Sequence, residues 1–547
     1  MDNKPLDVAY FSMEFAFDDR FHNYAGGLGV LSADTMYSSA DTGLAVAGVT
    51  LWYHQFDDPE KMLDAAPYMK KRDETVEVQI ENRMVKIAIW EYEAKGAGGK
   101  SVPVLFLSSY HPENKHWDRD LTKHIYASDR YTRLGQEAIL GIGGYRALKA
   151  CGFGPIKRYH MNEGHTALIG LERLRANGFN YDVVRTKSTF TTHTPVAAGH
   201  DYFDYQLARA SVGYILPHNI QDLATHDTFG MTQLAMNLSS RINAVSRTHR
   251  DVTRLMFPGR DIEYVTNGVY HPRWIGEPLS KLYNETIAGW QENPALFEKI
   301  FDVPEQRIIA AKREQKRSLI EWINAIPRCV CTADATEDDR FHEDTLTIGF
   351  ARRFVPYKRP DLIFKDLDRL RAIGFRKVQF VFAGKCHRDD MYCNQMRETI
   401  QHLDGELRGQ IRVAVAPDYN LETAKRLVTG VDVWLNNPIP PREASGTSGM
   451  KAAVNGTLNV SILDGWWTEG FEMRPKAGWG VVGNSGEGEG DALRDNAGLL
   501  GALEDAVHCY YERPTEWHER MKHAIALTSY FNTHRMLREY QERVWRS

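Results

Sequence analysis

The sequence predicts an α/β fold with two doubly wound domains, each a parallel sheet covered by helices on both faces. Short apolar runs that read as strands alternate with helical stretches, which is the pattern of strands buried on both sides. This alternation occurs twice along the chain. The length of 547 residues also exceeds what one ordinary hydrophobic core supports. We therefore expect two such domains.

The first half begins with a buried strand at 8–15, which is followed by the glycine loop "AGGLGV" and a polar helix ending at Gly43. Two stretches of alternating polarity, 76–93 and 102–109, flank a glycine-rich tip and predict a hairpin-like β region. A helix over 129–152 is predicted to be capped by Asp129 and stopped by Gly152. The remaining elements are strands at 157–165, 188–195 and 261–269 and a helix at 166–178.

The second half repeats the pattern, with apolar strands at 346–354, 378–385 and 411–417 separated by helices at 359–374 and 392–409. Strand signals lapse between 265 and 320, which is where we expect the linker. The predicted domains are residues 1–265 and 266–515. A long C-terminal helix, 516–547, is predicted to pack back across the first domain.

Composition excludes several classes of protein. The net charge of −5 argues against a general nucleic-acid binder. No run of 18 apolar residues occurs and the N-terminus lacks the layout of a signal peptide, so we expect a cytoplasmic protein without a membrane span. Six cysteines give no disulfide framework and are expected to be free thiols. We predict no metal site, because Cys329 and Cys331 lack a matching pair and "HRDD" at 387–390 reads as a surface loop.

Polar loops follow most of the predicted strands. In doubly wound sheets the ligand lies beyond the carboxyl ends of the strands, so these loops are expected to converge on one cleft between the domains. Their side chains include histidines, acids, amides and arginines. That inventory favours a polyhydroxylated, partly anionic substrate.

The loop "EASGTSGMK", residues 443–451, does not match a P-loop, because Lys451 does not directly follow a glycine and Ala452 has no hydroxyl. Nevertheless, Gly446, Thr447 and Ser448 offer backbone N–H groups and hydroxyls at a helix start, which suits an anion. A phosphate cradle beside a lysine suggests pyridoxal phosphate (PLP). The alternative is a capped helix with a surface lysine.

Other loops leave a functional and a structural interpretation open. Arg352, Arg353 and Lys358 follow a buried strand and either neutralise a phosphate or form a solvated basic turn. A lone histidine such as His165 or His193 is more often structural than functional. The paired tryptophans of "LDGWWTEGF", 463–471, stack on sugar rings or pack in the core.

Together, these loops resemble the α-glucan phosphorylase family in motif and order from about residue 8 to about residue 475, most specifically in "EASGTSGMKAAVNGTLNVSILDG". The resemblance implies a GT-B fold with an interdomain active-site cleft. It also implies the reversible reaction of an α-1,4-glucan or maltooligosaccharide with orthophosphate to give α-glucose 1-phosphate with retention. Lys451 then holds PLP, whose phosphate relays a proton.

The resemblance also implies roles for individual residues. Arg353, Lys358 and the Gly27 backbone bind the substrate phosphate, while Arg352 and the amides of Gly446, Thr447 and Ser448 bind the cofactor phosphate. The glucose hydroxyls are held by Glu443, Asn267, Tyr357 and His193 and by the Leu28 N–H group, with Glu163 and His165 beside them. We predict Arg353, Lys358, His193 and Glu443 as the catalytic set.

The chain departs from the family at two places. Val355-Pro356 stand where well-known members have His-Glu, and Asn420 replaces an arginine that often contacts the cofactor phosphate. The second change removes one charge-assisted bond, worth about 1.5–3 kcal/mol if uncompensated. Because the match starts near residue 1, we expect no phosphorylation switch, and whether the protein is a monomer or a homodimer stays open.

Two other functions remain possible at this point: a GT-B transferase that uses a nucleotide sugar, and a glucan-binding protein without catalysis. The transferase would not need Lys451. The binding protein would be expected to have lost Lys451, Arg353 or Lys358, and all three are present. The sequence therefore favours a phosphorylase.

Overall fold

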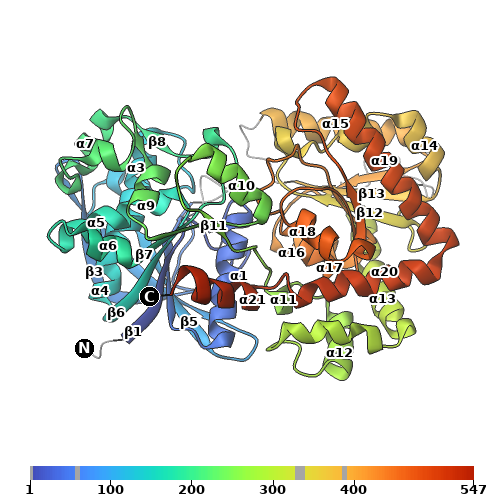
Figure 1. The fold of residues 1–547 in the computed structure, drawn as a ribbon, viewed down its shortest axis with the longest axis horizontal. Coiled ribbons are helices and arrows are strands. Elements are labelled where there is room, and N and C mark those ends of the chain that lie inside the picture. Colours follow the sequence, from blue (N-terminus) through green and yellow to red (C-terminus); the bar gives the residue numbers. More distant parts are fainter. Residues whose placement is uncertain (1–3, 22, 56–61, 327–338, 385–390, 547) are drawn as a thin grey trace. The chain divides into compact units, whose positions relative to one another are not determined.

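The computed structural model describes residues 4–21, 23–55, 62–326, 339–384 and 391–546 (Figure 1). The chain divides into two compact units. The first comprises Met1–Val245, Arg250–Val265 and Met536–Ser547, and the second comprises Ser246–His249 and Thr266–Arg535. The end of the chain thus returns to the first unit, where Trp545 donates a hydrogen bond to His160 (3.1 Å).

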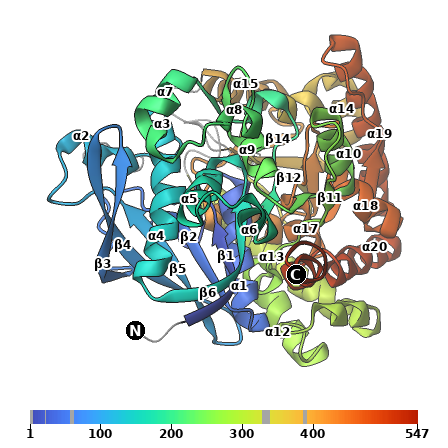
Figure 2. The ribbon, with the colours of Figure 1, turned by 60° about the vertical axis from the view of Figure 1, so that its left-hand side comes forward.

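Within the described residues of the first unit, nine strands form one sheet in the order β11-β10-β7-β6-β1-β2-β5-β4-β3. Neighbours from β11 to β5 are parallel, whereas β4 pairs antiparallel with both β5 and β3 (Figure 2). The antiparallel end is the predicted hairpin region. The strands are β1 Lys4–Phe11, β2 Val46–Leu51, β3 Lys70–Ile80, β4 Arg83–Lys95, β5 Ser101–Ser108, β6 Phe153–Asn162, β7 Ser188–Thr191, β10 Arg241–Ala244 and β11 Glu263–Tyr264, with a separate ribbon of β8 Tyr202–Phe203 and β9 Phe229–Gly230.

The second unit contains an all-parallel sheet, for which the described residues give the order β14-β13-β12-β15-β16-β17. Its strands are β12 Leu346–Ala351, β13 Val378–Ala383, β14 Arg412–Val415, β15 Val433–Asn436, β16 Leu458–Ile462 and β17 Gly478–Val481. The sheets confirm the predicted α/β fold with two doubly wound, Rossmann-type domains.

Helices follow the strands in both units (Figure 1). The first part of the chain contains α1 Gly27–Thr42, α2 His116–Arg119, α3 Arg130–Ala138, α4 Gly144–Ala150, α5 Leu168–Ala176, α6 Tyr181–Thr186, α7 Tyr205–Val212, α8 Ile220–Leu223, α9 Met231–Asn237 and α10 Arg247–Met256. The second part contains α11 His271–Trp274, α12 Glu277–Thr286, α13 Glu305–Ala325, α14 Leu367–Gly374, α15 Met391–Leu407, α16 Leu421–Gly430, α17 Ser448–Ala453, α18 Trp466–Met473, α19 Glu489–Glu512, α20 Pro514–Ala526 and α21 Thr533–Glu539.

The predicted helix boundaries in the first unit are confirmed at two caps. Gly43 ends α1 with φ +71°, and the Asp129 carboxylate accepts a hydrogen bond from the Thr132 N–H at the start of α3 (2.8 Å). The predicted single helix over 129–152 is interrupted by a π-helical segment at Ile139–Gly143. There, a side chain on Gly141 would lie 2.6 Å from the Ile169 backbone nitrogen, so only glycine permits this contact with α5.

Both faces of the first sheet are buried, as continuous apolar strands require. Along β1, Ala9 and Phe11 belong to one hydrophobic cluster, whereas Val8 and Tyr10 belong to another. Cys151 and Cys509 are free and buried, but Cys393 is disulfide-bonded, so the expectation of free thiols is wrong there. Cys329, Cys331 and 387–390 lie outside the described residues. In the described ranges, none of the helices combines the length and apolar character that a membrane crossing needs.

Candidate functional site

The strand order of the second sheet changes direction between β12 and β15, and this is where such sheets place their ligands. The basic segment 352–358 directly follows β12, and the loop that begins after Asn436 leads from β15 to α17. Most of the residues predicted from the second half of the chain therefore lie at this switch point.

Three of these residues form a buried ionic cluster. Arg352 donates a hydrogen bond to Glu443 Oε2 (2.5 Å), and Lys358 bonds to the same oxygen. Burial opposes ionisation of Glu443, but Arg352 and Lys358 outweigh it and lower the pKa of Glu443 to about 2. Burial and the neighbouring Arg352 lower the pKa of Lys358 to about 7, despite its bond to Glu443. The carboxylate is thus ionised at neutral pH.

The cluster has more positive than negative charge. Arg352 Nε and Nη1 are buried without a hydrogen-bond partner among the described residues. Arg353 is exposed, but its charge also disfavours protonation of Lys358. Arg352 and Lys358 therefore share one carboxylate oxygen, the exposed Arg353 adds a positive charge near Lys358, and the buried guanidinium keeps two donors without a partner among the described residues. This arrangement suits an anion, whose oxygens would accept these bonds.

Lys451 lies in α17 and is 8% exposed, so the alternative of a surface lysine is wrong. Its amine is 4.0 Å from the centre of the Trp274 ring. Asn455 fixes both residues, because its side-chain amide donates to the Trp274 carbonyl (2.8 Å) and to the Lys451 carbonyl (2.9 Å). The amine is thereby held against an apolar face, away from bulk water.

The loop before Lys451 presents backbone donors. Gly446 has φ +79°, a conformation that favours glycine. In the described part of the chain, no recorded hydrogen bond is donated by the backbone N–H groups of Gly446, Thr447 or Ser448. The Ser448 hydroxyl accepts a bond from Trp434 Nε1 (3.2 Å). These donors and Arg352 give the residues near Lys451 the composition that an anionic cofactor requires.

Asp464 fixes the position of Glu443. Its carboxylate accepts hydrogen bonds from the N–H groups of Glu443 and Gly465 (both 2.8 Å), and burial raises the pKa of Asp464 to about 7. Trp466, which follows Gly465, donates its backbone N–H to the Ser445 carbonyl (2.9 Å). Trp466 and Trp467 are fully buried, so the paired tryptophans pack in the core and do not form a sugar-stacking surface.

Asn267 and Tyr357 complete the predicted residues of the second unit. The loop of Asn267 is held by Arg535, which donates to the carbonyls of Thr266 (2.7 Å) and Asn267 (3.2 Å). The Asn267 side-chain oxygen is buried without a hydrogen-bond partner among the described residues, as a sugar-binding group would be before its ligand arrives. The Tyr357 ring centre lies 4.4 Å from the Lys358 amine.

The two departures from the family have local roles. Pro356 opens a short 3-10 helix, Pro356–Lys358, which carries Tyr357 and Lys358. The Asn420 side chain accepts the Thr423 N–H (2.8 Å) and so caps α16. The Asn420 amide oxygen is therefore bonded to a backbone N–H of the protein, whereas an arginine at this position would carry a positive charge.

In the first unit, the strand order changes direction between β1 and β6, and the remaining predicted residues follow these strands and β7. Glu163 has φ +78°, a strained conformation for a residue with a side chain. Its carboxylate accepts the backbone N–H of His193 (2.7 Å) and the Thr194 hydroxyl (2.9 Å). The His193 ring pairs with the Asn162 side chain (2.6 Å). Glu163 therefore fixes the loop that carries His193.

His165, Gly27 and Leu28 belong to the same unit. Burial lowers the pKa of His165 to about 3, so its ring is neutral, and its Nε2 has no partner in the described ranges. Gly27 and Leu28 form the start of α1, where backbone N–H groups have no acceptor within the helix. The sequence had predicted that this helix follows the glycine loop, but the glycine loop supplies its first turn.

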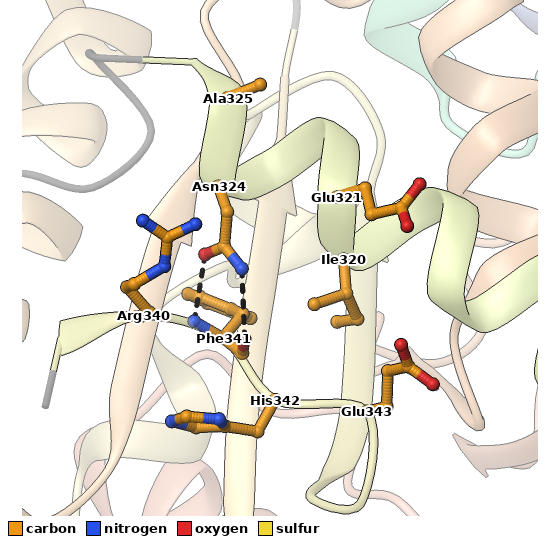
Figure 3. A pocket seen from close by; sticks show the side chains of 8 residues that line it. All are labelled: Ile320, Glu321, Asn324, Ala325, Arg340, Phe341, His342 and Glu343. Atoms are coloured by element: carbon orange, nitrogen blue, oxygen red, sulfur yellow. Dashed lines mark hydrogen bonds between the residues drawn. The ribbon is translucent and has the colours of Figure 1, made fainter. Parts of the chain in front are cut away.

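A pocket of about 370 Å³ lies between the end of α13 and the segment 340–343. Figure 3 shows its lining, where Asn324 exchanges two hydrogen bonds with the Phe341 backbone (3.0 and 2.9 Å). None of the predicted site residues lines it. Among the described residues, no group of three or more His, Cys, Asp or Glu side chains is arranged to hold a metal.

Sequence reasoning missed the residues that support the site. Trp274 and Asn455 hold Lys451, and Tyr419 donates its hydroxyl to the Ala351 carbonyl at the end of β12 (3.2 Å). Asp464 belongs to the segment 463–471, of which only the paired tryptophans were interpreted. The pattern Asp-Gly after a strand could have indicated a loop anchor, but a single sequence carries no signal for Trp274 or Asn455.

Comparison with known proteins gives two family models and several relatives. A model described as carbohydrate phosphorylase matches residues 216–478, and one described as starch synthase catalytic domain matches residues 19–266. The maltodextrin phosphorylase of Thermococcus litoralis is 33% identical over 98% of this chain and 70% of its own length. The glycogen phosphorylase of Aquifex aeolicus is 33% identical over 97% of this chain and 85% of its own length. An uncharacterised protein of Methanocaldococcus jannaschii is 30% identical over 98% of this chain and 99% of its own length.

Asp464 and Trp466 anchor the loop of Glu443 and Ser445, which predicts that the stability of the protein is sensitive to a substitution at Gly465. Its φ is +51°, and a side chain there would lie 2.5 Å from the Ser445 carbonyl oxygen. We expect Gly465→Ala to lower the free energy of unfolding by more than about 1 kcal/mol, because both strain and the clash must be relieved. Gly409→Ala is the control, since Gly409 has φ +74° but open space around it. Denaturant unfolding measures both, and equal losses would contradict the anchor.

Proposed function

Because this chain belongs to the carbohydrate phosphorylase family, we propose that it catalyses the reversible phosphorolysis of an α-1,4-glucan by orthophosphate, giving α-glucose 1-phosphate with retention. The observation that carries the proposal is the group of Arg352, Lys358 and the nearby Arg353 around Glu443, in which the buried Arg352 Nε and Nη1 have no hydrogen-bond partner among the described residues. An enzyme that transfers a glycosyl group to phosphate needs such a site, because the substrate is an anion. A polyhydroxylated chain and orthophosphate are therefore the proposed substrates.

We propose PLP as the cofactor, and the residues present fit it. Lys451 supplies a buried amine, while Arg352 Nε and Nη1 and the amides of Gly446, Thr447 and Ser448 supply donors without recorded partners. When bound, PLP supplies a phosphate that exchanges a proton with the substrate phosphate. Asn420 adds no charge to this cradle, because its side chain is a neutral amide, and the oxygen of that amide caps α16. Arg352 is consequently the main cationic contact that we expect.

The other residues of the second unit are proposed to bind the reacting groups. Lys358 and Arg353 bind the substrate phosphate, and the exposed position of Arg353 leaves its side chain able to approach an incoming anion. Glu443 stays ionised and accepts a hydrogen bond from a glucose hydroxyl. Asn267, with its buried oxygen, and Tyr357 bind further hydroxyls. These roles are the ones that the family resemblance implies, and the polarity of each group is compatible with them.

The first unit is proposed to bind glucose through backbone as well as side-chain groups. Gly27 and Leu28 offer N–H groups at the start of α1, to phosphate and sugar respectively. His193 is held in place by Glu163 and Asn162, which leaves its loop rigid before the sugar binds. His165, which is buried and neutral, is proposed to lie near the sugar. A cytoplasmic location, as expected from the sequence, completes the proposal.

The cofactor assignment predicts a single modified lysine. After borohydride treatment of the purified enzyme, peptide mass spectrometry should find the cofactor mass on Lys451. Lys312, another buried lysine, serves as the internal control and should carry none. A wild-type enzyme that is colourless and unmodified, yet transfers sugar from a nucleotide sugar, would instead favour the alternative transferase.

Lys358 is expected to act on phosphate and not on the cofactor. Lys358→Ala should reduce phosphorolysis by at least about a hundredfold, because the anion loses a buried cation. The amount of bound cofactor should stay at the wild-type level. Lys365→Ala is the matched control, since Lys365 is nearby in sequence but pairs with Asp361 at the surface (3.1 Å). Loss of cofactor with unchanged phosphate affinity would refute the assignment.

The pKa of Lys358 predicts how anion binding depends on pH. Its pKa of about 7 means that the amine is largely neutral above this value, so the Lys358 amine must take up a proton when an anion binds. Sulfate does not titrate in this range, and its affinity should fall by up to about tenfold per pH unit above pH 7. Calorimetry in buffers of different ionisation enthalpy measures the proton uptake. In Lys358→Arg the affinity should fall less steeply, because only Asp464 still titrates in this range, and a flat wild-type profile would contradict the site.

A further inference from the structure

Glu14 is a buried carboxylate that the proposed reaction does not yet use. It follows β1 and is 2% exposed. One oxygen accepts hydrogen bonds from the backbone N–H groups of Ala25 (2.5 Å) and Gly26 (3.0 Å), and the other accepts the Tyr126 hydroxyl (2.8 Å). Within the described residues, no salt bridge to Glu14 is recorded. A carboxylate buried without a cation is costly, and its neutral donors must hold it.

The residues that Glu14 binds are the two that precede α1. Gly26 is the residue before the helix, and Gly27 and Leu28 are its first two members. The carboxylate therefore uses the N–H groups of Ala25 and Gly26 and leaves those of Gly27 and Leu28, which the helix itself does not satisfy. A second contact fixes the same turn, because the Ala16 N–H donates to the Gly29 carbonyl (2.9 Å). There is no room for a side chain at Gly29, where it would lie 2.9 Å from Glu14 Oε2.

Tyr126 connects Glu14 to a charged network behind it. The Arg133 guanidinium lies 4.8 Å from the centre of the Tyr126 ring and pairs with Asp201 (2.6 Å) and Glu137 (3.2 Å). Tyr126 has φ +53°, a strained conformation that the surrounding contacts must maintain. Glu14 is thus held by this network through Tyr126. It in turn holds residues 25–29, the glycine turn, through the backbone N–H groups of Ala25 and Gly26.

We propose that Glu14 is a positioning residue: its carboxylate fixes Ala25 and Gly26, so that the N–H groups of Gly27 and Leu28 are presented to the substrate before it binds. The inference rests on the proposed function for the nature of that substrate. It adds a requirement of its own, namely that the glycine turn is rigid in the free enzyme because of one side chain. Rigidity of this kind lowers the cost of ordering donors on binding.

Two variants and a control test the proposal. Glu14→Gln keeps the shape but replaces the carboxylate by a neutral amide, whose oxygen accepts the Ala25 and Gly26 N–H groups more weakly, and Tyr126→Phe removes only the third hydrogen bond. Glu172→Gln is the control, because Glu172 on α5 is equally buried but pairs with Arg146 of α4 and with Arg175 of α5. Hydrogen exchange of the free enzyme reports on residues 23–31, and phosphorolysis kinetics report KM for phosphate and for glucan separately.

We expect Glu14→Gln to speed exchange in the glycine turn and to raise KM for phosphate by about tenfold, with cofactor content unchanged. Tyr126→Phe should give smaller changes in the same direction, and Glu172→Gln should give neither. Unchanged exchange in both variants, or a fall in kcat alone that Glu172→Gln reproduces, would overturn the proposal. A wild-type enzyme without phosphorolysis would overturn the proposed function instead, while the exchange measurement would still decide whether Glu14 fixes the turn.

Discussion

The carboxylate of Glu443, buried between Arg352 and Lys358, is the interaction on which the second unit's site depends. Without it, two cations would be buried side by side with no counter-charge, which a protein interior tolerates poorly. With it, the cluster is stable yet still positive, because the exposed Arg353 adds a third cation. Two N–H donors of the Arg352 guanidinium, at Nε and Nη1, have no hydrogen-bond partner among the described residues. A stable structure and a capacity for anions follow from the same charge balance.

The backbone around this carboxylate is held by groups that carry no chemistry themselves. Asp464 accepts the Glu443 N–H, Trp466 binds the Ser445 carbonyl, and Asn455 ties Lys451 to Trp274. The first unit uses the same device, since Glu163 holds the His193 loop and Glu14 holds the glycine turn. In both units, acidic side chains fix backbone N–H groups at the end of a strand. Ordering these loops in advance reduces the entropy lost when a substrate binds.

Much of this could be predicted from the sequence. Alternating strands and helices predicted both sheets, and the phosphorylase-like motif identified Lys451 and the residues before it. Local signals also predicted the caps at Asp129 and Gly43. The glycine loop was misjudged, because glycines usually end helices and here form the first turn of α1. The support from Trp274 and Tyr419 could not be predicted, since tertiary packing alone brings these distant residues to the site, and Asn455 gains its role from its hydrogen bond to the Trp274 carbonyl.

The central claim is that the group of Arg352, Lys358 and Glu443 is an anion site, and a crystal structure grown with PLP and phosphate would test it most directly. The account predicts a phosphate group within hydrogen-bond distance of Arg352 Nε and Nη1, with Arg352 still paired to Glu443. A structure in which these two nitrogens bind only water, while phosphate and cofactor occupy another part of the chain, would contradict it.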